Sequence, residues 1–253
     1  MQSVARISVT PVKGFALLRP DEVELTRVGV VEDRRFALVD AEGSRLSSSK
    51  TSWPAVVRGE YDSESETLVL RFPGGEVVEG SAVGAGPVRD WDFHHGQIEP
   101  GRVVEGEWND ILSGLAGYDV RIVRPEEPGR IREDPVTLVS RASVGRLERE
   151  AGASVDPRRF RMLFDLDGCS EHEEDTWNGR RLRVGDAVLR VGGPIPRCAV
   201  TTRDPDTGKR DLDTLRLIKS YRGLSDEKTI DFGVYAAVEE PGRVRVGDPV
   251  EPL

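Results

Sequence analysis

The sequence contains few residues of the types that build disulfide frameworks and metal clusters. Its 253 residues include two cysteines and three histidines. Two thiols cannot form a disulfide framework, so the role of each cysteine has to be considered singly. Cys169 and His172 have a metal-like spacing, but a closed zinc site needs about four ligands. Cys198 is the only other thiol that could complete it, and we therefore do not expect structural zinc.

The chain also lacks an excess of positive charge and any long apolar run. Its formal net charge is −9, and no run of Lys or Arg interleaved with aromatic residues offsets it. A polyphosphate backbone would be repelled, so nucleic acid is not expected as a partner. No apolar run approaches the length that spans a bilayer, and residues 4–9 at once show a strand-like alternation. We expect a cytoplasmic protein without a membrane partner.

Short strand-like segments dominate the pattern that is present. Apolar residues make up 37% of the chain and charged residues 32%, which is typical of a soluble globular protein. Segments with strand character, separated by turn signals, are residues 35–39, 67–72, 182–184, 187–191 and 234–238. The sequence therefore predicts a mainly β (α+β) fold.

Helical patterns are fewer. They cover residues 108–116, 143–150 and 213–221, with Ser143 as the candidate N-cap of the second. Because strands and helices do not alternate over a long stretch, a doubly wound parallel sheet is not expected. The polar, proline-containing segment 124–129 is the clearest break in composition. We place a domain boundary there, giving domains 1–124 and 125–253.

The segment most indicative of chemistry surrounds Cys198. Gly192, Gly193, Pro194 and Pro196 predict a stiff loop after a strand, with Cys198 at its end beside Arg197. An adjacent guanidinium favours the thiolate, which is both a nucleophile and a ligand for soft metals. The alternative is an inert cysteine that is buried at the start of a strand.

A run of acidic residues at 171–175 offers a second candidate site. Its carboxylates are ligands that Mg²⁺ or Ca²⁺ would accept. Consecutive side chains on an extended chain point to alternate sides, so few of them can converge on one ion. A solvated loop is the better interpretation, with Asp175 as the member expected to have a structural role.

Several motifs resemble those of one protein family. Arg197-Cys198, followed by Thr201-Thr202 and by Asp204-Pro-Asp-Thr-Gly208, resembles the cysteine motif of the MOSC family, the molybdenum cofactor sulfurase C-terminal domains. The similarity extends to residues 174–177, 215–222, 232–235 and 247–250. In the first half, residues 11–14 and 33–39 resemble the N-terminal β-barrel domain that precedes MOSC in amidoxime-reducing enzymes.

The resemblance implies a fold, a cofactor and an activity. The fold would consist of linked β-barrels, a MOSC N-terminal barrel followed by a MOSC barrel with a few short helices. The cofactor would be molybdenum held by molybdopterin and by the thiolate of Cys198, which would also be the catalytic residue. The activity would be the reduction of small N-hydroxylated substrates. Electrons would come from a separate protein, which could be cytochrome b5-like, a flavoprotein or a ferredoxin.

Further residues are implied as cofactor contacts. An acidic protein has to supply positive charge locally to bind the phosphate and the anionic dithiolene of this cofactor. The positions that match the family are Lys13, Arg35, Lys50, Ser140, Arg161, Arg197 and Tyr235. Met162, Leu163 and Pro196 depart from the family pattern, which affects the surroundings of the cofactor and the choice of substrate.

Two other functions stay open at the level of sequence. Cys198 could carry a persulfide and transfer sulfur without binding a metal, or the chain could carry the cofactor without turnover. The chain has no pyridoxal-phosphate sulfurase domain, although the family leaves pyridoxal phosphate binding open. An N-terminal barrel of the amidoxime-reducing type favours the oxidoreductase.

Overall fold

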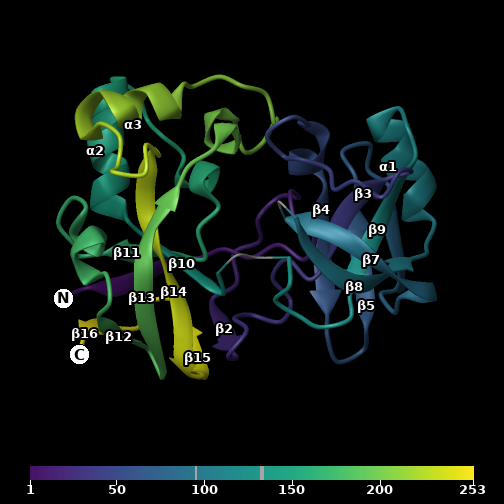
Figure 1. The fold of residues 1–253 in the computed structure, drawn as a ribbon, viewed down its shortest axis with the longest axis horizontal. Helices are drawn as coiled ribbons and strands as arrows, with labels where there is room; N and C mark the ends of the chain where they lie inside the picture. Colours follow the sequence, from purple (N-terminus) through teal and green to yellow (C-terminus); the bar gives the residue numbers. More distant parts are fainter. Residues whose placement is uncertain (95, 132–133) are drawn as a thin grey trace.

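The computed structural model describes residues 1–94, 96–131 and 134–253. Strands form most of the regular structure, and two sheet-rich halves lie side by side (Figure 1). The prediction of a mainly β protein is confirmed. The division at residues 124 and 125 stays a prediction, and strands β1 (Ser3–Ile7) and β2 (Glu22–Leu25) pair with strands of the second half.

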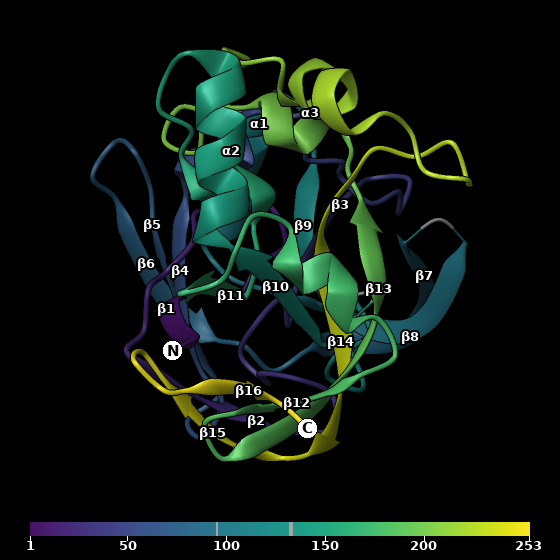
Figure 2. The ribbon, with the colours of Figure 1, turned by 90° about the vertical axis from the view of Figure 1, so that its left-hand side faces the viewer.

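One half is built on a seven-stranded sheet that nearly closes into a barrel. Its strands, in spatial order, are β1, β11 (Phe164–Asp167), β10 (Val136–Ser140), β14 (Asp231–Glu240), β13 (Ala187–Pro196), β12 (Arg181–Val184) and β16 (Val250–Pro252). The two edges meet where Val4 N donates to Asp248 O at 2.9 Å and Val250 N donates to Gln2 O at 2.9 Å. The beginning and the end of the chain thus complete the same barrel (Figure 2).

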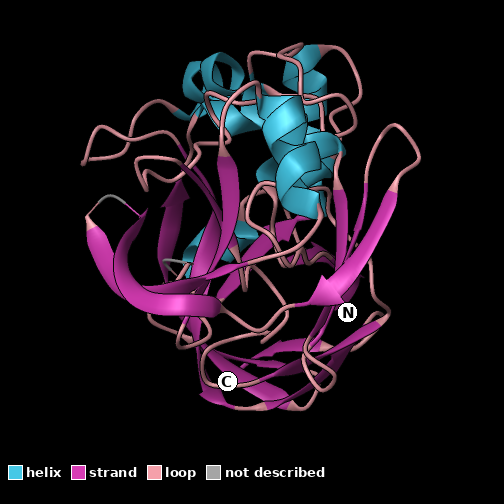
Figure 3. Cartoon of the chain, turned by 90° about the vertical axis from the view of Figure 1, so that its right-hand side faces the viewer, coloured by secondary structure: helices cyan, strands magenta, loops and turns pink. Residues whose placement is uncertain are grey.

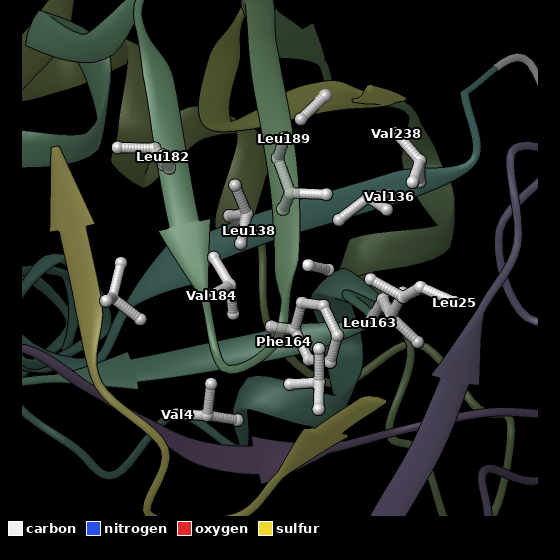
Figure 4. Close-up of a cluster of buried hydrophobic side chains, with 14 of the residues drawn as sticks. Val4, Leu25, Val136, Leu138, Leu163, Phe164, Leu182, Val184, Leu189 and Val238 are labelled. Carbon is white, nitrogen blue, oxygen red and sulfur yellow. The ribbon is translucent and has the colours of Figure 1, made fainter. Parts of the chain in front are cut away.

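The interior of this barrel is filled by aliphatic and aromatic side chains from most of its strands (Figure 4). On β10, Val136 and Leu138 point into it, whereas Val139 joins a second cluster on the outer face. This alternation is the two-residue period expected of a strand that is covered on both faces. A short sheet of β15 (Gly242–Arg245) and β2 adds Val244 and Leu25 to the same core.

The other half contains two sheets around a second core. One has the order β3 (Ala37–Asp40), β9 (Val120–Pro125), β8 (Gln97–Val104) and β7 (Ala85–His94), and the other β4 (Arg58–Asp62), β5 (Thr67–Arg71) and β6 (Val77–Ser81). Residues of both sheets, with Trp108 of helix α1 (Trp108–Ala116), share one buried cluster. This is the second barrel, which faces the viewer in Figure 3.

Two helices lie side by side at one end of the seven-stranded sheet, where the first packs against β10 and β11 (Figure 2). They are α2 (Arg141–Ala151) and α3 (Thr214–Arg222). The expected helix at residues 108–116 is α1 itself, and α3 begins after the cap Asp213, whose carboxylate accepts from Arg216 N. The predicted cap Ser143 is wrong: Ser140 caps α2 by accepting from Ala142 N at 3.1 Å.

The predicted loop before Cys198 is wrong as well. Strand β13 continues to Pro196, and the last two of the three shifts in its pairing with β14 lie between Val191 and Gly193 and between Pro194 and Pro196. Gly192 permits this path, because a Cβ there would lie 2.1 Å from the ring of Tyr235. Cys198 therefore follows an irregular strand end. Among the described residues, no helix combines the length and apolar character needed to cross a bilayer.

Candidate functional site

Cys198 lies at the surface where β13 ends. Its backbone is extended, with φ −112° and ψ 176°, and it caps the 3₁₀ turn η4 (Ala199–Thr202) through its carbonyl, which accepts from Thr201 N at 3.2 Å. The side chain is exposed and takes no part in the capping. The thiol is therefore accessible to a ligand, unlike the inert buried cysteine considered above.

A hollow beside this strand end is lined by four cationic side chains. They are Lys13, Arg34, Arg161 and Arg197, and two carboxylates, Asp33 and Asp134, line it too. Lys13 and Arg34 come from the N-terminal half and Arg161 and Arg197 from the C-terminal half. The hollow thus lies where the two halves meet, and we call this surface the seam. Its four cations outnumber its two carboxylates, so the sign of the local charge is opposite to that of the whole chain, −9.

Arg161 lies at the centre of the seam. It follows the turn η2 (Pro157–Phe160), has a left-handed φ of 53°, and lines three neighbouring hollows. Its Nη2 donates to Phe15 O at 2.7 Å, and its own carbonyl accepts from Arg34 at 2.8 Å. Burial and the nearby charge of Arg34 lower the pKa of Arg161 to about 9, so it is still cationic at pH 7.

A second hollow continues the cationic surface toward the other side of Arg161. Arg158, Arg159 and Arg203 line it together with the hydroxyl residues Ser48 and Thr51. Within the part of the chain that the structure describes, the buried Nε atoms of Arg159 and Arg203 have no hydrogen-bond partner. Because unpaired buried donors are costly, these atoms indicate a place for an acceptor that comes from outside the chain.

The structure brings Arg34, and not Arg35, to the seam. Arg35 is 4% exposed and its Nη1 donates to Pro125 O at 2.6 Å inside the N-terminal half. Burial, chiefly, lowers its pKa to about 10. Sequence reasoning missed Arg34 because the two arginines are adjacent and only their backbone geometry separates them. Arg34 has a φ of 51° and so lies before the regular alternation of β3 begins.

The other predicted contacts lie at different distances from the seam. Lys50 is exposed in a loop whose Ser49 carbonyl accepts from Arg203 at 2.8 Å. Tyr235 is half-buried, and its ring lies against Gly192 and Gly193. Its partner on β10 is Thr137, which lines the cationic hollow. The loop that carries Lys50 and the ring of Tyr235 thus border the seam.

Ser140 belongs to a separate polar cluster beneath α2. Its backbone N donates to Glu174 Oε1 at 3.1 Å, and Ser143 Oγ donates to the same oxygen at 2.8 Å. Glu174 is fully buried in the turn η3 (Glu173–Trp177), so the predicted solvated loop is wrong for this residue. Burial raises the pKa of Glu174, and its Oε2 has no hydrogen-bond partner among the described residues.

The remaining charged and aromatic groups of this cluster pair with one another. Asp175 accepts from Arg222 at 2.6 Å, which gives it the expected structural role. His172 Nε2 lies 3.1 Å from the hydroxyl of Tyr221. Burial and the charge of Arg222 lower the pKa of His172 to about 4.

Cys169 lies close to the carboxylates of this cluster. Burial together with these carboxylates raises the pKa of Cys169 to about 12. Outside the masked positions, no three His, Cys, Asp or Glu side chains gather as metal ligands.

Comparison with protein families identifies both parts of the chain. The MOSC domain model matches residues 92–251, and the model of the MOSC N-terminal beta barrel domain matches residues 1–102. The chain belongs to the MOSC domain family. The family predicted from the cysteine motif is confirmed, and with it the fold of linked barrels.

Curated relatives match nearly the whole chain. The mitochondrial amidoxime-reducing component 1 of Homo sapiens is 27% identical over 281 residues, covering 98% of this chain and 82% of the relative. The mitochondrial amidoxime reducing component 2 of Bos taurus is 28% identical over 282 residues, with the same coverage. Among solved structures, the YUAD protein from Bacillus subtilis aligns over 99% of this chain and 94% of its own, at 11% identity and a TM-score of 0.44.

Proposed function

We propose that this MOSC protein binds a molybdenum cofactor in the seam and reduces small N-hydroxylated compounds. The observation that carries the proposal is an exposed thiol, Cys198, beside a hollow lined by four cationic side chains in a protein of net charge −9. The relatives named for amidoxime reduction, which match the chain over 98% of its length, support the substrate class.

The residues of the seam fit the charge of such a cofactor. Molybdopterin carries a phosphate and an anionic dithiolene, and Lys13, Arg34 and Arg161 provide cations from both halves. The partnerless Nε atoms of Arg159 and Arg203 add donors that an anion can satisfy. Cys198 offers the soft thiolate ligand that molybdenum accepts. When bound, the group supplies two-electron redox chemistry at the N–O bond.

The position of each predicted cofactor contact in the structure reduces the number of residues that we propose for the site. We propose Cys198 as the ligand, with Lys13, Arg34 and Arg161 as the principal cofactor contacts and Tyr235 and Lys50 at the border. Arg35 and Ser140 are left out, because Arg35 is buried against Pro125 O and Ser140 lies in the separate cluster around Glu174. Arg197 is treated separately below.

The reaction consumes two electrons and two protons for each N–O bond that is cleaved to N–H and water. These 253 residues contain two cysteines and so cannot hold a four-cysteine iron–sulfur cluster, and we propose that a separate protein supplies the electrons. The exposure of Cys198 allows such a donor, of the cytochrome b5-like, flavin or ferredoxin type, to approach the site closely. The cytoplasmic location stays a prediction.

Persulfide transfer is the second candidate function, because the exposed thiol of Cys198, which makes no capping hydrogen bond, is equally accessible to sulfur donors.

One experiment distinguishes molybdenum-dependent reduction from persulfide transfer. Protein produced in a host that makes the cofactor should contain molybdenum and, with reduced methyl viologen as electron donor, should convert benzamidoxime to benzamidine. The metal-free protein should not. Molybdenum-loaded protein that fails on amidoximes, N-hydroxylated bases and N-oxides, with a persulfide found on Cys198 by mass spectrometry, would move the function to sulfur transfer.

A further inference from the structure

Arg197, the residue before Cys198, directs its guanidinium into the protein. Nε donates to Phe232 O at 2.7 Å, Nη1 donates to Phe160 O at 3.2 Å, and Nη2 donates again to Phe232 O. The backbone N of Arg197 donates to Ile230 O at 2.7 Å. All three nitrogens of the side chain are therefore engaged by groups of this chain.

These bonds join three segments that are distant in sequence. Phe232 lies near the start of β14, and Phe160 ends the turn η2, one residue before Arg161. Arg161 in turn donates to Phe15 O of the N-terminal half. Arg197 thus links the backbone next to Cys198 to the backbone next to Arg161.

The packing around the guanidinium leaves it little freedom. Its carbon lies 5.6 Å from the centre of the Phe160 ring, which stacks on Phe232 with 4.4 Å between ring centres. Met162 Sδ accepts from Nη2 at 2.8 Å. Gly233 has a φ of 73°, and a Cβ there would lie 2.6 Å from Met162 Cε and 3.4 Å from Nη2. Met162, one of the departures from the family pattern, is part of this packing.

We propose that Arg197 is a positioning residue that fixes Cys198 relative to Arg161, and that its guanidinium does not hold the cofactor. The inference rests on the proposed function for the identity of the ligand that Cys198 binds. Its geometric part depends only on the bonds to Phe160 and Phe232. Burial lowers the pKa of Arg197 to about 10, which leaves it cationic at pH 7 and suited to bonds with carbonyl oxygens.

Lysine tests the difference between charge and geometry. An ammonium group keeps the charge, but it is a single point and cannot reproduce the planar fork that bridges two carbonyls. If Arg197 contacts the anionic cofactor, Arg197→Lys should keep most of the function that Arg197→Met loses. If Arg197 positions Cys198, both variants should be impaired alike.

The experiment compares Arg197→Lys, Arg197→Met and a control, Arg216→Met, which changes an exposed arginine on α3. We expect molybdenum content after dialysis within about twofold of wild type in all three. Turnover per molybdenum should fall about tenfold or more in both Arg197 variants, with KM for benzamidoxime unchanged, because a misplaced reacting centre lowers the rate more than binding.

Hydrogen exchange of the metal-free chains gives a readout that does not depend on activity. Residues 158–163 and 229–233 should exchange faster in both Arg197 variants than in Arg216→Met. Met162→Leu, which removes the sulfur that accepts from Arg197 Nη2 and keeps an apolar side chain of similar size, should show the same pattern in weaker form if an Arg197 variant fails to fold. Rescue by lysine, a selective loss of molybdenum, or unchanged exchange would overturn the positioning role. Absence of molybdenum from the wild type would instead contradict the proposed function.

Discussion

The two cysteines of this protein lie in two polar regions of opposite character. Cys198 is exposed at the end of β13, beside a seam where Lys13, Arg34 and Arg161 gather. Cys169 is half-buried near Glu173 and Glu174, and its surroundings raise its pKa to about 12. The same side chain is therefore available for ligation in one region and held as a thiol in the other.

The regions also differ in how their charges are satisfied. Around Cys169, Arg222 pairs with Asp175, and Ser143 donates to Glu174. In the seam, Arg34 pairs with Asp33, whereas Arg161 donates to the backbone carbonyl of Phe15. The hollow there is lined by four cations and two carboxylates, so the balance of charge stays positive. A local excess of one charge favours a ligand site, whereas balanced pairs favour a structural role.

Exchanging the thiols one at a time should give the largest contrast. We expect Cys198→Ser to lower molybdenum-dependent turnover by at least about a hundredfold, since one soft ligand is lost. Cys169→Ser should stay within about twofold of wild type, and the benzamidoxime assay measures both. Equal losses in the two variants would remove the contrast.

Thiol labelling should separate the two environments without any cofactor. At pH 7, a thiol of pKa about 12 has about a thousandfold less thiolate than a free cysteine. Iodoacetamide should therefore modify Cys169 about a thousandfold more slowly than it modifies the unfolded chain. The rate should rise about tenfold per pH unit up to pH 10. Peptide mapping gives the rates. Fast labelling of Cys169 at pH 7 would contradict its assignment as a half-buried thiol with a raised pKa.

Removing one arginine from each region sharpens the comparison of charges. Arg161→Met should weaken cofactor retention by about ten- to a hundredfold, because a charge-assisted contact to an anion contributes about 1.5–3 kcal/mol. Arg222→Met, in the paired cluster, should destabilise the fold but leave retention unchanged. Molybdenum content after extended dialysis measures this, and equal retention in both variants would count against the seam as the site.

The smallest expected effect is a pH dependence of stability from the paired cluster. The folded pKa of His172, about 4, lies below its unfolded value near 6.5, so the unfolded chain binds the proton first as the pH falls. Stability present above pH 6.5 is then lost toward pH 4, by about 1–2 kcal/mol between pH 7 and pH 5. His172→Gln should flatten this part of the profile in urea unfolding. A profile as steep as that of wild type would show that other groups cause it.

The family and the fold class could be predicted from the sequence, because motifs and strand periodicity are local signals. The exact match of α1 at residues 108–116 has the same origin. Positions within the site were less predictable. Whether Arg34 or Arg35 faces the seam depends on one left-handed backbone angle, and no local pattern reports it.

Burial through distant contacts was the other property that the sequence did not reveal. Glu174 stands in an acidic run that is typical of a solvated loop, yet it is buried against Ser140 and Ser143, more than thirty residues earlier. The inward path of Arg197 likewise depends on carbonyls of Phe160 and Phe232. Such partners become adjacent only when the sheet has formed.

The sulfur coordination of molybdenum tests the central claim most directly. X-ray absorption at the molybdenum edge, together with metal analysis, should be measured on wild type, Cys198→Ser and Cys169→Ser. We predict that Cys198→Ser either loses molybdenum or retains it with one sulfur ligand fewer, while Cys169→Ser keeps both the metal and its sulfur shell. Full molybdenum content with an unchanged sulfur shell in Cys198→Ser would contradict the assignment of Cys198 as the ligand.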